Sequence, residues 1–145
     1  MKYSISFVMP MYNEAANIED SVTRISNLAN ELTGDYEVII ADDASTDTSA
    51  DIVKGIASRD PHIKLIRLKK NTKFGGALAE GLKNAGKEVV IYTDSDLPVK
   101  EDDIKKGLAL LDKADIVTGC SMVIKDMSRE PVKDDKVFCF GIFSH

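Results

Sequence analysis

Short apolar segments alternate with longer amphipathic segments along most of the chain. The apolar runs are rich in β-branched residues, which predicts buried strands at residues 4–9, 36–41, 63–68, 88–93 and 115–119. The segments between them favour helices, which are predicted over residues 14–32, 46–59, 75–85 and 100–114. Strands that alternate with helices form a mostly parallel sheet with helices on both faces. The pattern therefore predicts an α/β fold.

The chain after residue 119 does not continue this alternation. Residues 125–136 are polar and are predicted to form a loop, whereas residues 137–143 (VFCFGIF) are apolar. A domain rarely ends directly after such a run. Either the run is a last strand or helix, or a part of the protein that should follow it is missing.

The overall composition is that of one folded domain without a basic surface. With 145 residues, 43% of them hydrophobic, the chain is expected to form a single core. Its net charge of −5 argues against a general nucleic-acid binder, because no basic excess is available to neutralise phosphates. No apolar run reaches the roughly 20 residues of a spanning helix, and the N-terminal apolar stretch is too short for a signal peptide. We expect a cytoplasmic protein that can still be peripheral to a membrane.

The cysteines and histidines suggest no catalytic centre. Cys120 and Cys139 are the only cysteines and do not form a C-x-x-C motif, so two free thiols in a reducing compartment are expected. The only histidines are His62 and His145. A histidine-based zinc site and a Ser-His-Asp triad are therefore disfavoured, and no G-x-S-x-G motif is present.

Polar residues gather after the predicted strands. They form four segments, residues 10–14 (PMYNE), 42–47 (DDASTD), 71–76 (NTKFGG) and 93–96 (TDSD). Each segment alone has a structural explanation, because Asp and Asn side chains also serve in turns and helix caps. In mostly parallel sheets, however, ligands bind beyond the carboxyl ends of the strands, near the point where the strand order reverses. Because all four segments follow predicted strands, they are expected to lie at this same edge of the sheet, which favours a ligand site.

Asp94 and Asp96 form a carboxylate pair at the end of the strand predicted over residues 88–93. Like charges this close repel each other, and a divalent cation removes the repulsion. Mg²⁺ and Mn²⁺ prefer oxygen ligands, and Mg²⁺ is often held by one or two carboxylates together with substrate phosphates. Asp43 and Glu14 can accept hydrogen bonds from a base or a ribose. The sequence therefore predicts a site for a nucleoside diphosphate with Mg²⁺ or Mn²⁺.

Three segments resemble family-two glycosyltransferases with the GT-A fold. VMPMYNEAANI (8–18) resembles the family's V-x-P-x-Y-N-E opening, and ADDASTDTSADI (41–52) resembles its D-D-x-S-x-D segment. The run over residues 71–97 resembles the family's glycine-rich stretch leading to D-x-D. Order and spacing match from about residue 5 to residue 119. The resemblance is greatest to the dolichyl-phosphate mannose synthase group of polyprenyl-phosphate hexose transferases.

The resemblance implies a Rossmann-like sandwich of the GT-A type with a mostly parallel central sheet. It also implies a UDP- or GDP-sugar donor whose hexose passes to an acceptor, in this group a polyprenyl phosphate. The residues that would line the nucleotide pocket are Pro10, Tyr12, Glu14 and Asp43. Those that would contact the ribose, the diphosphate and the metal are Asp94, Ser95 and Asp96, with Asp94 and Asp96 as metal ligands. The metal would neutralise charge that develops on the leaving diphosphate.

The chain departs from the family pattern in several places. Lys73 stands where the family usually has the first glycine of its glycine-rich loop, and Pro98 stands where the synthase group often has a metal-binding glutamine. In residues 119–122 (GCSM), Ser121 replaces the arginine of the common G-S-R-x. Family members also continue past this point with the catalytic base and the acceptor site. We therefore expect residues 1–145 to be a single nucleotide-sugar-binding domain without its acceptor part and with no assigned base.

Other functions remain open at this point. A non-catalytic remnant would keep the nucleotide-binding half without transferring sugar. A signalling receiver domain could use Asp94 or Asp96 as a phosphoacceptor, but it would leave the N-terminal segment without a role and it lacks a clear strand-end lysine. A sugar nucleotidyltransferase is disfavoured, because no glycine-rich loop with an arginine follows the first predicted strand.

Overall fold

The computed structural model describes residues 3–96, 100–120 and 139–144. Strands and helices alternate along the chain as far as the fifth strand. The strands are β1 (Ile5–Met11), β2 (Tyr36–Asp42), β3 (Ile63–Arg67), β4 (Val89–Tyr92), β5 (Ile116–Cys120) and β6 (Cys139–Ser144). The helices are α1 (Ile18–Leu32), α2 (Ser49–Ala57), α3 (Lys73–Lys83) and α4 (Glu101–Leu110). Every strand and helix predicted from the sequence is present, although the bounds differ.

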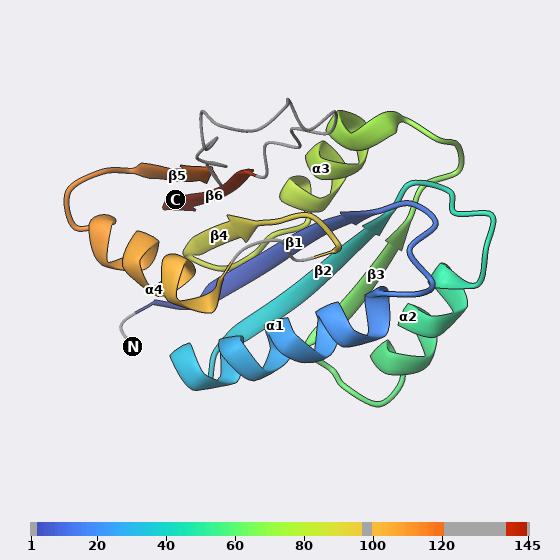
Figure 1. The fold of residues 1–145 in the computed structure, drawn as a ribbon, viewed down its shortest axis with the longest axis horizontal. Coiled ribbons are helices and arrows are strands. Elements are labelled where there is room, and N and C mark those ends of the chain that lie inside the picture. Colours follow the sequence, from blue (N-terminus) through green and yellow to red (C-terminus); the bar gives the residue numbers. More distant parts are fainter. Residues whose placement is uncertain (1–2, 97–99, 121–138, 145) are drawn as a thin grey trace, which may run out of the picture.

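The strands form one sheet in the order β3-β2-β1-β4-β6-β5. β1 pairs in parallel with β2 and β4, and β3 pairs in parallel with β2, whereas β6 runs antiparallel to β4 and β5. Figure 1 shows the sheet with α1 and α2 in front of it. The predicted α/β fold with a mostly parallel sheet is confirmed. The strand order reverses between β1 and β4, which is where such sheets bind ligands.

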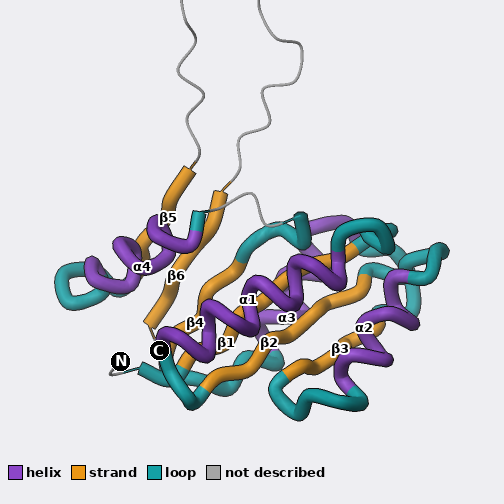
Figure 2. The backbone as a smooth tube through the Cα atoms, turned by 60° about the horizontal axis from the view of Figure 1, so that its bottom comes forward, coloured by secondary structure: helices purple, strands orange, loops and turns teal. Residues whose placement is uncertain are grey.

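Alternate residues of β1 belong to two apolar layers on opposite faces of the sheet. Phe7 is fully buried in the layer that contains Val53 of α2 and Ile104 of α4, together with the apolar side of α1. Val8 is fully buried in the other layer, against Leu78 of α3. In the described part of the chain, α1, α2 and α4 therefore cover one face of the sheet and α3 covers the other. Figure 2 shows α4 beside β5 and β6, at the end of the sheet remote from β3.

The helix predicted from residue 14 begins only at Ile18. The carbonyl of Glu14 accepts hydrogen bonds from the N–H groups of Asn17 and Ile18, at 3.0 and 2.9 Å, which forms a turn ahead of the helix. The N–H of Glu14 itself donates to the hydroxyl of Ser49, at 2.8 Å. This segment is therefore held against α2 as a loop. The bounds of the other three helices differ by one to four residues from those predicted.

The first strand extends through Pro10 to Met11, beyond the predicted end at residue 9. β4 pairs with β1 only as far as Val8, and the carbonyl of Val8 accepts the N–H of Thr93 at 3.1 Å. Backbone groups alternate along a strand, so the nitrogen of Pro10 also faces the β4 side, beyond the last paired residue. A missing N–H costs no ladder hydrogen bond there. The prediction that Pro10 and Met11 follow the strand is wrong for this reason.

The apolar run predicted over residues 137–143 contributes the last strand, β6, rather than a helix. β6 lies between β4 and β5, with Gly141 directly opposite Tyr92. A Cβ at position 141 would lie 2.2 Å from Cε1 of Tyr92, so the aromatic ring occupies the space that the glycine leaves. The ring also stacks on Phe143, with centroids 5.8 Å apart. A side chain larger than hydrogen at position 141 is therefore incompatible with this packing.

Some sequence predictions concern residues outside the described ranges. They are those for Pro98, for Ser121 and for the polar segment 125–136. Among the residues that the structure does describe, no helix combines the length and the apolar character needed to cross a membrane.

Candidate functional site

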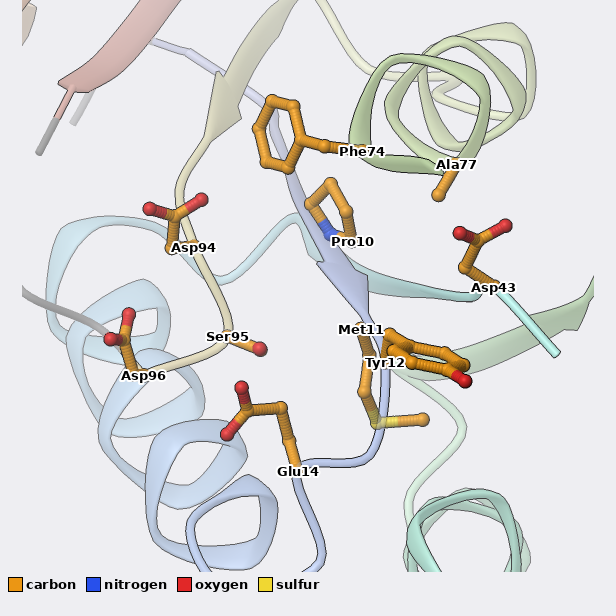
Figure 3. A pocket seen from close by; sticks show the side chains of 10 residues that line it. All are labelled: Pro10, Met11, Tyr12, Glu14, Asp43, Phe74, Ala77, Asp94, Ser95 and Asp96. Carbon is orange, nitrogen blue, oxygen red and sulfur yellow. The ribbon is translucent and has the colours of Figure 1, made fainter. Parts of the chain in front are cut away.

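A pocket of about 270 Å³ lies at the carboxyl ends of β1 and β4, where the strand order reverses (Figure 3). All the site residues predicted from the sequence line it, namely Pro10, Tyr12, Glu14, Asp43, Asp94, Ser95 and Asp96. Met11, Phe74 and Ala77 complete the lining. The fold thus brings together residues from four separate segments. Their roles in binding stay predictions.

The segment after β4 places carboxylates on one side of the pocket. Asp94 is partly buried, Ser95 is buried and Asp96 is exposed. Figure 3 shows the carboxylate of Glu14 directed toward the loop that carries Asp94 and Asp96. Burial, followed by the negative charges of Asp96 and Glu14, raises the pKa of the Asp94 carboxyl above its usual range. The repulsion is therefore built into the pocket, and a cation would relieve it.

The protein side chains alone do not form a complete metal site. Among the described residues, no three His, Cys, Asp or Glu side chains are grouped so that they could hold an ion. Asp94 and Asp96 supply oxygen donors of the kind that Mg²⁺ and Mn²⁺ prefer. Mg²⁺ commonly takes one or two carboxylates and completes its coordination with substrate phosphates and water. The donor set therefore fits a metal that binds together with a diphosphate.

Asp43 lies across the pocket from Asp94 and Asp96, beyond Pro10 (Figure 3). Its side chain is buried, and Oδ1 accepts hydrogen bonds from the backbone N–H of Thr72 at 2.6 Å and from its hydroxyl at 2.8 Å. These bonds join the end of β2 to the residue before α3. Both of these bonds go to Oδ1, which leaves the second carboxylate oxygen to accept a bond from a ligand.

Asn13 braces two of the loops that form the pocket. Its φ is 53°, a left-handed conformation that asparagine adopts more readily than most residues. Its side-chain oxygen accepts the N–H of Thr46 at 2.8 Å, and its own N–H donates to the hydroxyl of Ser45 at 2.9 Å. These bonds tie the loop after β1 to the loop after β2. Asn13 therefore positions the neighbouring residues Tyr12 and Glu14.

Two further carboxylates of the polar segments have structural roles and do not line the pocket. Asp42 is buried, accepts the N–H of Ser45 at 3.0 Å, and lies 3.2 Å from Nε of Arg67. Asp47 accepts the N–H of Ser49 at 2.9 Å, at the first residue of α2. Asp42 therefore holds the turn after β2, and Asp47 binds the start of α2 from the residue before its N-cap, Thr48.

Sequence reasoning missed the apolar wall of the pocket. Phe74 and Ala77 come from the beginning of α3, and Met11 comes from the end of β1. The side chain of Phe74 is 51% exposed, unusually open for such an apolar ring. Figure 3 shows the ring among the side chains that line the pocket. The sequence did contain a signal for Phe74, because it is an aromatic residue within the polar segment 71–76. An aromatic side chain in such a segment is a candidate for contact with a ligand.

Lys73 adopts a left-handed conformation, with φ of 66°, at the start of α3. Glycine adopts this conformation freely, whereas an L-residue with a Cβ atom pays about 1–2 kcal/mol for it. Lys73 stands where the glycosyltransferase pattern described above usually has glycine. Lysine at this position therefore lowers the stability of the fold, although the backbone still adopts the left-handed conformation.

Comparison with known proteins identifies the family. The model of Glycosyl transferase family 2 matches residues 6–143. The chain belongs to this family. The matched region contains every loop that lines the pocket. The resemblance seen in the sequence is confirmed, and the receiver-domain alternative is wrong.

Two curated relatives carry the names of lipid-phosphate transferases. A dolichol-phosphate mannosyltransferase from Pyrococcus furiosus is 32% identical over 120 residues, which make up 82% of this chain and 33% of the relative. An undecaprenyl-phosphate 4-deoxy-4-formamido-L-arabinose transferase from Salmonella choleraesuis is 29% identical over 116 residues, 79% of this chain and 36% of the relative. The chain thus spans about a third of the length of these relatives.

Solved structures of glycosyltransferases share the fold. The mannosyltransferase PcManGT from Pyrobaculum calidifontis, in complex with GDP-Man and Mn²⁺, matches with a TM-score of 0.69 and 25% identity over 81% of this chain and 35% of that one. TarS from S. aureus, in complex with UDP-GlcNAc, matches with a TM-score of 0.62 and 25% identity over 78% of this chain and 33% of that one. The expected GT-A-type architecture is therefore confirmed.

Proposed function

We propose that this chain is the donor-binding domain of a hexosyltransferase that holds a UDP- or GDP-sugar with Mg²⁺ or Mn²⁺ and serves transfer to a polyprenyl phosphate. Family membership supports the transferase class. The relatives named for dolichol and undecaprenyl phosphates support the acceptor, and the neighbours with GDP-Man and Mn²⁺ or with UDP-GlcNAc support the donor. An acceptor of this kind lies in a membrane, so a cytoplasmic protein peripheral to the membrane fits the proposal.

The observation that carries the proposal is the charge of the pocket. Its lining contains the carboxylates of Glu14, Asp43, Asp94 and Asp96, and none of the described residues that line it is Lys or Arg. A diphosphate carries charge of the same sign and would be repelled. A divalent cation on Asp94 and Asp96 would reverse the local sign and bridge to phosphate oxygens. Diphosphate binding is therefore expected to require the metal.

The two sides of the pocket suit two parts of a nucleotide. On one side, Asp43 can accept a hydrogen bond from an N–H of a uracil or guanine base, and the 46% exposed ring of Tyr12 can cover the base or the ribose. On the other side, Asp94 and Asp96 would hold the metal and the diphosphate. The hydroxyl of Ser95 can donate a hydrogen bond between these groups. The pocket would thus orient the donor with its diphosphate beside β4.

The residues of this chain would contribute binding and orientation. A bound metal would supply neutralisation of charge on the leaving diphosphate, an effect of several kcal/mol in metal-dependent transfer. Asp94 and Asp96 would fix that metal, while Asp43 and the loop braced by Asn13 would fix the nucleotide. No described residue is assigned as a general base. A phosphate acceptor is already ionised and does not require one.

Nucleotide binding is tested by thermal unfolding with UDP or GDP, each with and without Mn²⁺. Binding at 100 times the dissociation constant stabilises a folded protein by about 2.7 kcal/mol, or roughly 5–10 °C for a domain of this size. Asp96→Asn should abolish the Mn²⁺-dependent part of the shift. The matched control is Asp51→Asn, an exposed carboxylate of α2 that does not line the pocket, and it should retain the full shift. The proposal fails if no nucleoside diphosphate at millimolar concentration shifts the melting temperature.

Sugar transfer is tested separately from binding. The chain is incubated with labelled UDP-glucose or GDP-mannose, Mn²⁺ and polyprenyl phosphate in detergent. Lipid-linked sugar above the level of Asp96→Asn would show that this chain is itself an active transferase. Metal-dependent nucleotide binding without transfer would instead favour the remnant that keeps only the donor half.

A further inference from the structure

Basic residues are concentrated in the segment that runs from β3 into α3. Residues 61–79 contain five Lys or Arg residues and neither Asp nor Glu, although the whole chain has 24 acidic residues and a net charge of −5. Three of the five, Lys69, Lys70 and Lys73, follow the strand and are exposed. They have no ion-pair partner among the described residues, whereas the two basic residues of β3 are each paired with a carboxylate.

Hydrogen bonds hold this segment at the edge of the sheet where the pocket lies. The N–H of Leu68 donates to the carbonyl of Asp42 at 2.9 Å, and the N–H of Thr72 donates to Oδ1 of Asp43 at 2.6 Å. Residues 68–72 are thereby held to the carboxyl end of β2 at both ends. Figure 1 shows this connection at the same end of the sheet as the loops after β1 and β2. Two strands separate β3 from β4, so the connection lies across this edge from the carboxylates that follow β4.

In the described part of the chain, the acidic side chains of the neighbouring loop after β2 are engaged with other groups. Asp42 is buried and forms an ion pair with Arg67, at 3.2 Å from Nε. Asp43 and Asp47 accept hydrogen bonds from backbone N–H groups. The positive charge of the three lysines is therefore available to a partner outside this part of the chain.

Two exposed aromatic rings accompany the lysines at this edge. Phe74 follows Lys73 directly and is 51% exposed, and Tyr12, after β1, is 46% exposed. The other exposed large hydrophobic side chains among the described residues, Leu110 and Ile116, belong to α4 and β5. Lysines beside aromatic rings suit a membrane surface, because lysine is attracted to anionic headgroups and aromatic rings lie at the boundary between headgroups and acyl chains.

We propose that Lys69, Lys70 and Lys73 dock the domain on a membrane surface that carries anionic phospholipids. The inference rests on the proposed function, since a polyprenyl-phosphate acceptor lies in a membrane. Docking by this edge would turn the donor pocket toward the lipid, where the phosphate of the acceptor lies. The chain as a whole is acidic and would be repelled by the same surface, so the lysines would also decide which edge of the domain approaches it.

Cosedimentation of the full chain with lipid vesicles, without nucleotide or divalent metal, tests the proposal. We expect binding at low salt to vesicles of phosphatidylcholine mixed with phosphatidylglycerol, and little binding to phosphatidylcholine alone. High salt should weaken the binding, because ions screen exposed charges. Lys69→Gln/Lys70→Gln should weaken it by about 25-fold, since each lysine near an anionic surface contributes about fivefold.

Lys54→Gln/Lys113→Gln is the matched control. Both lysines are exposed and the double variant loses the same charge, but Lys54 lies in the last turn of α2 and Lys113 follows α4. This variant should bind anionic vesicles as the wild type does. The proposal is overturned if both double variants lose binding equally, because the net charge and not the segment after β3 would then be responsible.

Nucleotide binding by the same variants separates docking from donor binding. Neither Lys69 nor Lys70 lines the pocket, so Lys69→Gln/Lys70→Gln should keep the melting shift with UDP or GDP and Mn²⁺. A wild-type chain that binds anionic vesicles but no nucleotide would refute the donor site alone. The docking proposal is overturned if the wild type does not bind anionic vesicles at low salt, or binds phosphatidylcholine vesicles equally. Equally tight binding to single-stranded DNA would also overturn it, because the lysines would then recognise polyanions in general.

Discussion

The carboxylate of Asp43 accepts two hydrogen bonds from Thr72, one from its backbone N–H at 2.6 Å and one from its hydroxyl at 2.8 Å. Asp43 directly follows the last residue of β2, and Thr72 immediately precedes α3. A Cβ added at Gly76 would lie 2.3 Å from the hydroxyl oxygen of Thr72. The glycine in the next turn of the helix therefore leaves the space in which the hydroxyl meets the carboxylate.

We expect Gly76→Ala to destabilise the domain although it adds a better helix former. The new methyl group would push Thr72 away from Asp43, and a hydrogen bond to a buried charged group contributes about 1.5–3 kcal/mol. The higher helix propensity of alanine relative to glycine stabilises the helix by only about 1 kcal/mol. A net loss of about 0.5–2 kcal/mol should appear in urea unfolding.

Gly75→Ala provides the control for this prediction. Apart from its chain neighbours and the backbone of α3, no described atom lies within 4 Å of a Cβ built at Gly75, and its φ is not positive. The substitution should therefore stabilise the domain by about 0.5–1 kcal/mol. Equal stabilisation by both alanine variants would contradict the packing of Gly76 against Thr72.

Lys73→Gly should stabilise the domain, because the residue holds a left-handed φ of 66°. Removing the Cβ atom relieves about 1–2 kcal/mol of conformational strain in the folded state. Glycine also has more conformational freedom in the unfolded chain, which offsets part of this gain. A net gain of about 0.5–1 kcal/mol is expected in chemical unfolding. Lys73→Ala removes the same charge but keeps the Cβ atom, so it should give no gain. If alanine stabilises as much as glycine, the lysine charge and not the backbone is responsible.

The sequence predicts those parts of the fold that depend on local pattern. The alternation of strands and helices, and the placing of Asp43, Asp94 and Asp96 after strands, follow from periodicity and the general behaviour of parallel sheets. That Pro10 lies inside a strand depends on where the neighbouring strand stops pairing. No periodicity of the chain itself contains that information.

The remaining features depend on contacts between distant segments. β6 inserts between β4 and β5, and the sequence shows only that residues 137–143 are apolar. The brace from Asn13 to Thr46 joins loops that are more than thirty residues apart. Phe74 lines the pocket from the second residue of α3, a helix that begins two residues earlier than its pattern indicates. These errors have one cause, since tertiary contacts decide where an element ends and which face a loop residue presents.

Gly141→Ala should destabilise the domain by about 1–3 kcal/mol, the usual cost of overpacking. Its Cβ would lie 2.2 Å from Cε1 of Tyr92, and that ring is stacked on Phe143 and cannot move aside freely. A double-mutant cycle with Tyr92→Ala isolates the clash. Gly141→Ala should cost much less in the Tyr92→Ala background. Equal costs in both backgrounds would place the effect elsewhere in β6.

The pH dependence of stability should reveal the repulsion around Asp94. Burial and the charges of Asp96 and Glu14 raise its pKa in the folded state, so the folded protein binds a proton more tightly than the unfolded chain does. Between the ordinary pKa of aspartate and the raised folded value, stability falls as pH rises, and the loss is complete above the folded pKa. Asp94→Asn should remove this decrease of stability with rising pH. It should also stabilise the metal-free domain at pH 7, by at most about 1 kcal/mol because solvent screens the charge of a partly exposed group.

Asp96→Asn separates the causes of the raised pKa. Burial acts on Asp94 whether or not its neighbour is charged, whereas repulsion by Asp96 disappears when that carboxylate becomes an amide. An NMR titration of the Asp94 carboxyl should therefore give a lower pKa in Asp96→Asn than in the wild type, yet one still above the usual value. Mg²⁺, which is diamagnetic, should lower the pKa of Asp94 in the wild type when it is added with a nucleoside diphosphate, because a bound cation favours the ionised carboxylate. A pKa of Asp94 that is the same in both proteins would mean that the two carboxylates do not interact, and the case for a shared metal ligand pair would be lost with it.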